Sequence, residues 1–117
     1  MSAHPIIVRD LARQDELEAY LDLAVDAFHA RDGAERIAGW RQAMRERPRL
    51  YPTRLRGAFE GPVCVGGYSL FERPMRLGHA GRASAWLRVG CLGAVAVHSE
   101  RRNQGIGRAL LYDVLAQ

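Results

Sequence analysis

Hydrophobic residues recur at helical spacing in three stretches of the chain. Residues 13–30 carry apolar side chains at intervals of four, three and four positions, with acidic residues at many of the positions between them. In residues 34–46 apolar side chains again share one face, after a predicted helix stop at Gly33 and before Pro48, which ends the pattern. A third apolar face follows Gly105. This spacing predicts three amphipathic helices. Their apolar faces are Leu17, Leu21, Ala24 and Phe28; Ile37, Trp40 and Met44; and Ile106, Leu110 and Val114.

Four other stretches, residues 5–10, 53–60, 63–71 and 86–97, are rich in β-branched and aromatic residues and predict strands. The sequence Glu60-Gly61-Pro62 predicts a turn between the second and third strands. Gly66 and Gly67 are costly inside a strand, so they indicate either a bulge or a close approach by another group. We expect Arg73-Pro74 to disturb the end of this strand, and residues 78–82 to form a polar, flexible connection.

The stretch at residues 86–97 is the longest predicted strand. Simple alternation divides its side chains between two faces, both largely apolar near the end of the strand. One face holds Leu87, Val89, Cys91, Val95 and Val97, and the other holds Trp86, Arg88, Leu92, Ala94 and Ala96. Such a strand is typical of the centre of a sheet that is covered on both sides.

The predicted order of strand, helix, helix, three strands and helix indicates an α/β fold with one core. The chain has 117 residues, of which 48% are hydrophobic, so we expect a single ordered domain. No apolar run approaches the roughly 20 residues that span a bilayer, which favours a cytoplasmic protein. Cys64 and Cys91 lie in predicted strands without metal-binding spacing, so we expect reduced core thiols and no metal.

The junction between the last strand and the last helix carries the clearest chemistry. The turn Arg102-x-x-Gly105-x-Gly107 places two residues without a Cβ where the backbone enters a helix. The first amides of a helix lack intrahelical acceptors, and the helix dipole adds positive charge there, so a phosphate or pyrophosphate is the natural ligand. We expect Arg101, Arg102 and Arg108 to add full charges around that anion.

This turn, after the strand Ala94-Val95-Ala96-Val97 and before Arg108-Ala109-Leu110-Leu111, resembles the acetyl-CoA motif of the GNAT acyltransferases. The resemblance implies an N-acetyltransferase in which a primary amine attacks acetyl-CoA directly in a ternary complex. By position, it implies a pantetheine-binding strand at Val95, Ala96 and Val97. It also implies a pyrophosphate cradle formed by Arg102, Asn103, Gln104, Gly105, Ile106, Gly107 and Arg108. Sequence around Gly67-Tyr68, Pro74-Met75-Arg76 and Gly93-Ala94-Val95 resembles, more weakly, the enhanced intracellular survival branch.

The predicted order matches only about the first two thirds of a GNAT domain. The strands and the helix that complete the family fold, including the helix with the tyrosine that protonates the leaving thiolate, have no counterpart before Gln117. We therefore expect residues 1–117 to form a single, incomplete domain. Without a further strand, residues 86–97 would present an unpaired apolar edge. This favours a fragment of a longer acyltransferase or a homo-oligomer that completes the sheet.

No residue is assigned as the catalytic base or acid. Glu72 near a strand end, His98 beside the cradle and Tyr112 on the last helix are candidates, but solvated or structural roles suit each of them as well. The resemblance places the acceptor site beside the second helix. Trp40 and Tyr51 could therefore contact an acceptor, although packing roles are favoured.

Two other functional classes remain open. A CoA-binding or regulatory module, or an inactive fragment, would keep the cradle and lack the catalytic acid. A nucleic-acid-binding module would use the eight arginines of residues 31–56, which face only three acids in that segment. That segment lacks interleaved aromatic residues for base stacking, so solvated helix faces are the favoured interpretation.

Overall fold

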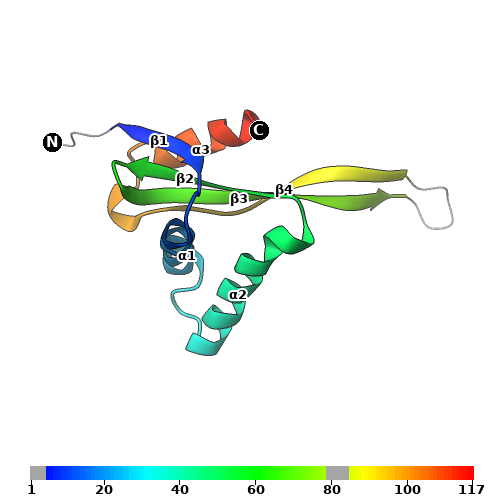
Figure 1. Cartoon of the computed structure of the whole chain (residues 1–117), viewed down its shortest axis with the longest axis horizontal. Helices are drawn as coiled ribbons and strands as arrows, with labels where there is room; N and C mark the ends of the chain where they lie inside the picture. The colour runs from blue at the N-terminus through cyan, green and yellow to red at the C-terminus, as the bar shows by residue number, and fades with distance from the viewer. Residues whose placement is uncertain (1–4, 79–84) are drawn as a thin grey trace.

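The computed structural model describes residues 5–78 and 85–117. Its strands are β1 (Ile6–Asp10), β2 (Thr53–Glu60), β3 (Val63–Leu77) and β4 (Ala85–Val97), and its helices are α1 (Gln14–Phe28), α2 (Ala34–Leu50) and α3 (Ile106–Leu115). The strands form one antiparallel sheet in the order β1-β2-β3-β4. α1 and α2 lie on one face of this sheet and α3 on the other (Figure 1). The predicted α/β fold and order of elements are confirmed.

The core has one apolar cluster on each face of the sheet. On the α3 side, Ile106 and Leu110 pack against strand residues that include Val65 and Tyr68. On the other side, Tyr20 and Leu21 of α1 pack with Met44 of α2. Leu110 and Leu21 are fully buried, so the apolar faces read from the sequence do cover the two sides of the sheet.

The predicted face of α1 is wrong at one end. Leu21 and Ala24 are buried, but Phe28 is 58% exposed because α1 ends there, beyond the part of the helix that lies on the sheet. Tyr20 and Glu16, which the pattern did not select, are buried. Glu16 tolerates burial because its carboxylate receives two hydrogen bonds from Arg9, at 2.6 and 3.1 Å.

Pro48 does not end α2, which continues to Leu50. A proline in the last turn removes one intrahelical hydrogen bond, and the helix still closes with a bond from Tyr51 N to Arg47 O at 3.0 Å. Contacts with α1 also hold this helix. Arg45 donates two hydrogen bonds to Glu18, at 2.6 and 2.9 Å.

β3 also runs through a proline that was expected to disturb it. β2 begins at Thr53, which lies opposite Phe71 of β3. The part of β3 after Phe71 therefore pairs only with β4, and these two strands extend as a two-stranded arm (Figure 1). Glu72 N bonds to Pro52 O at 2.9 Å, on the side where β2 lies. Backbone N–H groups alternate in direction along a strand, so the nitrogen of Pro74 faces that same side, where the strand has become an edge. The expected connection at residues 78–82 falls mostly outside the described residues.

A bulge in β4 breaks the alternation predicted for that strand. Gly67 pairs with Ala96 and Ser69 pairs with Gly93, so three steps of β4 oppose two steps of β3. Ala94, at the bulge, has a φ of +46°. Directly paired residues share a face of the sheet. Cys91, which is paired with Phe71 before the bulge, therefore lies on the same face as Ala96 and not with Val95 and Val97.

Candidate active site

The turn between β4 and α3 has the conformation that its glycine spacing predicts. A short 3-10 helix, Ser99–Arg101, follows the strand, and Asn103 and Gly105 then adopt positive φ angles of 66° and 82°. Gly105 is the N-cap of α3. Most L side chains are strained at this φ, so the backbone conformation favours glycine here.

The start of α3 exposes a group of amides without backbone partners. Among the described residues, the first amide of this helix to bond a backbone carbonyl is that of Ala109, which bonds to Gly105 O at 3.0 Å. The four preceding amides, from Gly105 to Arg108, have no such acceptor. A Cβ built on Gly105 would meet nothing within 4 Å, so the space above the turn is open. This arrangement fits a phosphate or pyrophosphate group.

Arginines surround the turn, but not all of them are available to an anion. Arg101 is held by Glu60 through two contacts, at 2.6 and 3.1 Å, so the expectation that it adds charge to the cradle is wrong. Arg108 is exposed and donates to Tyr112 Oη at 3.1 Å. Arg102 is exposed and takes part in no ion pair within residues 5–78 and 85–117.

The other predicted cradle residues lie where the sequence places them. Asn103 and Gln104 are exposed in the turn. Ile106 is 3% exposed and packs in the core, so only its backbone faces the cradle. A Cβ on Gly107 would lie 3.7 Å from Val97 Cγ2, which places the end of β4 directly beneath the first turn of α3.

β4, the strand predicted to bind pantetheine, forms an edge of the described sheet. Val95 and Val97 pack toward the α3 side, and Ala96 is 2% exposed. The apolar edge predicted for this strand is therefore present in the described part of the chain, beside the cradle.

The position of α3 is fixed by an ionic contact that sequence reasoning missed. Asp113 receives hydrogen bonds from Arg56, at 2.6 and 3.1 Å, and from the buried Tyr68 hydroxyl, at 2.6 Å. Burial raises the pKa of Asp113, but the bonds from Arg56 and Tyr68 outweigh it and leave the pKa below its usual value. The only signal in the sequence is an acidic residue near the apolar face of a helix.

The bulge of β4 is fixed by a second group that the sequence did not single out. The hydroxyl of Tyr20, fully buried on α1, donates to Ala94 O at 2.8 Å. Ser69 Oγ donates to Gly93 O at 3.2 Å. Burial raises the pKa of Tyr20 well above its usual value, so this hydroxyl remains a donor at neutral pH.

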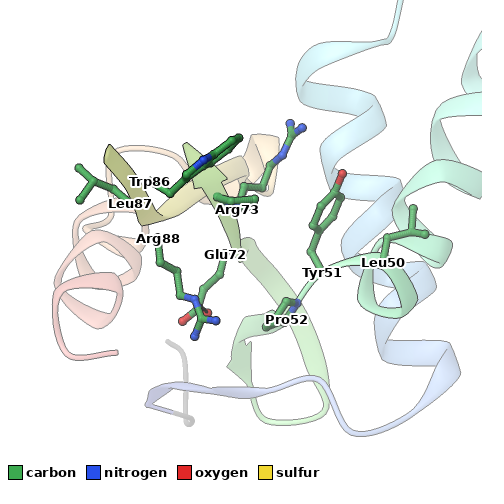
Figure 2. A pocket seen from close by; sticks show the side chains of 9 residues that line it. Leu50, Tyr51, Pro52, Glu72, Arg73, Trp86, Leu87 and Arg88 are labelled. Atoms are coloured by element: carbon green, nitrogen blue, oxygen red, sulfur yellow. Dashed lines mark ion pairs between the residues drawn. The ribbon is translucent and has the colours of Figure 1, made fainter. Parts of the chain in front are cut away.

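A pocket of about 490 Å³ lies where α2 meets the arm of β3 and β4. Figure 2 shows Tyr51 opposite the arm. In this view Arg73 and Trp86 of the arm lie above, and Glu72 and Arg88 lie below them. Leu50, Pro52, Pro74 and Leu87 complete the lining. Trp40 does not reach this pocket and stacks against His29, with ring centroids 4.6 Å apart. The packing role predicted for Trp40 is confirmed, whereas Tyr51 is available to a ligand.

The three candidates for proton transfer lie in separate places. Glu72 is in the middle of β3 and not at its end, and its carboxylate lies 3.7 Å from Arg88. It pairs with Gly90, four residues before Ala94, or roughly 13 Å along the strand at 3.3 Å per residue. His98 Nδ1 accepts a hydrogen bond from Glu100 N at 3.1 Å and caps the 3-10 helix. Tyr112 is 59% exposed beside Arg108.

Cys64 and Cys91 are free and half-buried, and burial raises the pKa of the Cys64 thiol. Across residues 5–78 and 85–117, no group of three or more His, Cys, Asp or Glu side chains is arranged to hold a metal ion. No helix in those ranges has the length and apolar character needed to cross a membrane.

Half of the arginines in the basic segment at residues 31–56 are paired with acids from other segments. Arg41 and Arg45 contact Glu18, and Arg54 and Arg56 contact Asp10. These four of the eight arginines are therefore not part of an open basic surface, which weakens the case for a nucleic-acid-binding module.

Comparison with known proteins agrees with this geometry. The sequence model of the acetyltransferase (GNAT) domain family matches residues 8–117. No curated protein matches. A GCN5-related N-acetyltransferase from Ralstonia eutropha superposes with a TM-score of 0.68 at 22% identity, over 96% of this chain and 74% of that one. A GNAT family acetyltransferase from Brucella melitensis, solved in complex with acetyl-CoA, gives 0.66 at 21% identity, over 97% and 68%.

A third solved structure, an acetyltransferase from Trypanosoma brucei, has a TM-score of 0.64 at 22% identity, over 96% of this chain and 73% of that one. At these identities the structural likenesses establish the fold. The family model covers nearly the whole sequence, including the glycine turn, and establishes the relationship: the chain belongs to the GNAT family of acetyltransferases.

Proposed function

We propose that this chain binds acetyl-CoA at the turn between β4 and α3 and transfers the acetyl group to a primary amine. One observation carries the proposal. Gly105, at a φ of 82°, begins a helix whose amides from Gly105 to Arg108 have no backbone acceptor among the described residues, and the space above it is open. These amides, with Arg102 and Arg108, would hold the pyrophosphate, while Asn103 and Gln104 would line the turn.

β4 would supply the second part of the donor site. Val95, Ala96 and Val97 lie on an edge of the described sheet, where backbone groups can pair with the amide-containing pantetheine arm. Acetyl-CoA contributes an activated thioester. Holding that thioester beside the bulge would let amides of β4 polarise its carbonyl, and the reaction would depend mainly on positioning of the attacking amine.

The residues described here would orient the reactants more than they would exchange protons. The Tyr20 hydroxyl holds the bulge through Ala94 O, and the Asp113 contact with Arg56 holds α3 against the sheet. Neither His98, which caps a 3-10 helix, nor Glu72, which lies far along β3, is assigned as a base. The amine would arrive neutral, at a pH near or above its own pKa. Its attack would form the C–N bond and break the C–S bond, and the proton lost by nitrogen would pass through solvent to the departing CoA thiolate.

Calorimetric titration with acetyl-CoA, followed by mass spectrometry of mixed amines incubated with donor and protein, tests the proposal. We expect a Kd on the order of micromolar and acetylated amine as product. In Gly105→Glu the new carboxylate fills the open space and repels the pyrophosphate. We expect a loss of affinity of at least about 100-fold, or roughly 3 kcal/mol.

Gly39→Glu is the matched control. Gly39 is exposed on α2, and a Cβ there also meets nothing within 4 Å. Gly105→Asn is a second variant that separates the effect of added bulk from the effect of added charge, because asparagine tolerates positive φ and adds no charge. Unchanged affinity in a folded Gly105→Glu protein would remove the cradle from the proposal. Tight binding without any acetylated product would favour the CoA-binding module instead.

A further inference from the structure

Arg47, in the last turn of α2, is a half-buried cation without an acidic partner. Its neighbours on the same helix, Arg41 and Arg45, both pair with Glu18. Arg47 takes part in no ion pair within the described residues, and residues 1–4 and 79–84 contain no Asp or Glu. Partial burial of a guanidinium without an acidic partner costs free energy, and a carboxylate ligand would offset that cost.

Aromatic side chains hold this cation in place. The Arg47 guanidinium carbon lies 4.3 Å from the centre of the Phe71 ring, and the Phe71 and Tyr51 rings are 6.1 Å apart. Arg73, which also lacks an ion pair in the described ranges, lies 5.1 Å from the Tyr51 ring. We call these four side chains the Arg47–Arg73 row. The Phe71 ring covers one face of the Arg47 guanidinium, and the Tyr51 ring covers one face of the Arg73 guanidinium. The N–H groups at the edge of each guanidinium can still donate hydrogen bonds in the plane of that group.

The row begins beside the bulge of β4 and ends in the pocket of Figure 2. A Cβ built on Gly93 would lie 3.5 Å from Arg47 Nη1 and 3.0 Å from Ser69 Oγ. Gly93 precedes Ala94, whose carbonyl accepts a hydrogen bond from Tyr20. Gly93 is also two residues before Val95, the first of the residues assigned to pantetheine binding. Arg47 therefore lies on the α1 and α2 side of the place where the proposed thioester would be held.

We infer that the acceptor is an amine that also carries a carboxylate only a few atoms away, as in an amino acid, and that Arg47 binds this carboxylate. The inference rests on the proposed function, because it names the acceptor class for the same site. A carboxylate matches the planar edge of a guanidinium with two parallel hydrogen bonds. Because Arg47 Nη1 lies beside Gly93, the residue before Ala94, a carboxylate bound there would be separated from the reacting amine by only a few atoms. Phe71 and Tyr51 would contact an apolar side chain.

The test uses glycine, leucine and phenylalanine, each as the free acid and as its α-amide, with the whole chain. Initial rates with acetyl-CoA give kcat and KM for the wild type, Arg47→Gln, Arg47→Lys and Arg49→Gln. Arg49→Gln is the control because Arg49 lies in the same last turn and is exposed, and the substitution removes the same charge.

For at least one pair, we expect the wild type to have a KM for the acid about 10- to 100-fold lower than for the amide. Arg47→Gln should abolish that preference with little change in kcat, Arg47→Lys should restore part of it, and Arg49→Gln should keep it. A preference that survives Arg47→Gln, or no preference for any acid, would overturn the inference.

A binding measurement separates this inference from the proposed function. Without donor, each acid is titrated into ¹⁵N-labelled protein while the Arg47 Nε and Gly93 amide resonances are followed. We expect saturable shifts at both in the wild type, and no shift of the Gly93 amide in Arg47→Gln. Shifts with no acetyl transfer would retain the carboxylate site and reject the transfer reaction. Acetyl-CoA binding and acetyl transfer without these shifts would retain the transfer reaction and reject the carboxylate site.

Discussion

Gly67→Ala should destabilise the protein through one crowded contact between β3 and α1. A Cβ at this position would lie 2.6 Å from Tyr20 Cδ1 and 2.9 Å from Arg56 O. The Tyr20 ring is fully buried and its hydroxyl is bonded to Ala94 O, so the ring cannot turn aside freely. The Arg56 oxygen belongs to the backbone of a paired strand and can move only if the sheet distorts.

The magnitude follows from two opposing effects. Overpacking of a close-packed core costs about 1–3 kcal/mol. Replacing glycine lowers the entropy of the unfolded chain and returns about 0.4–1 kcal/mol. The backbone contact favours the upper part of the first range, so the expected net loss is about 1–2 kcal/mol. For a domain of this size, that lowers Tm by roughly 5–10 °C.

Urea unfolding followed by circular dichroism, with Gly90→Ala as the control, measures this effect. A Cβ on Gly90 meets only Leu70 Cδ1, at 3.6 Å, so that variant should be neutral or slightly stabilised. In a double-mutant cycle, Gly67→Ala should lower the free energy of unfolding less in a Tyr20→Leu background than in the wild type, with a coupling energy of about 1 kcal/mol. Additive effects, or equal stabilities for the two alanine variants, would refute the proposed clash.

Two further predictions concern charges. Asp113→Asn weakens the contact that ties α3 to Arg56, and should lower the free energy of unfolding by about 2–3 kcal/mol in urea titrations. The exposed Asp26→Asn is its control, and equal losses would show that the contact is not stabilising. Hydrogen bonds from Arg45 lower the pKa of Glu18 from 4.5 to about 2, so its stabilisation is complete above 4.5 and is lost as the pH falls toward 2. The stability difference between wild type and Glu18→Gln should therefore shrink over that window, and a constant difference would contradict this assignment.

The predictions from sequence succeed where a local pattern determines the structure. The helix periods at Leu21, Met44 and Leu110 all lead to buried side chains. The turn at Gly105 was predictable because its positive φ is a local requirement that glycine meets most readily. The extent of Ile106–Leu115 also follows the apolar period after that turn.

The failures that affect the candidate site and the arm depend on partners that are distant in sequence. Whether Arg101 is free for an anion depends on Glu60, 41 residues away. The bulge that changes the faces of β4 is held by Tyr20, 74 residues from Ala94. Pro74 was expected to disturb β3, but it lies beyond the end of β2, where the strand needs no donor on that side. No local pattern contains these relationships.

The glycine pair in β3 shows how one short segment sets both halves of the candidate site. Gly66 faces α3, where a Cβ would lie 3.1 Å from Ile106 Cγ2 and 3.2 Å from Leu110 Cδ1. Gly67 faces the Tyr20 ring on the other side of the sheet. The absence of both Cβ atoms lets α3, which carries the cradle, and α1, which holds the β4 bulge, approach the same two residues from opposite faces. Since larger side chains would push both helices away from the sheet, this pair determines how closely the layer with the cradle and the layer that holds the bulge approach β3.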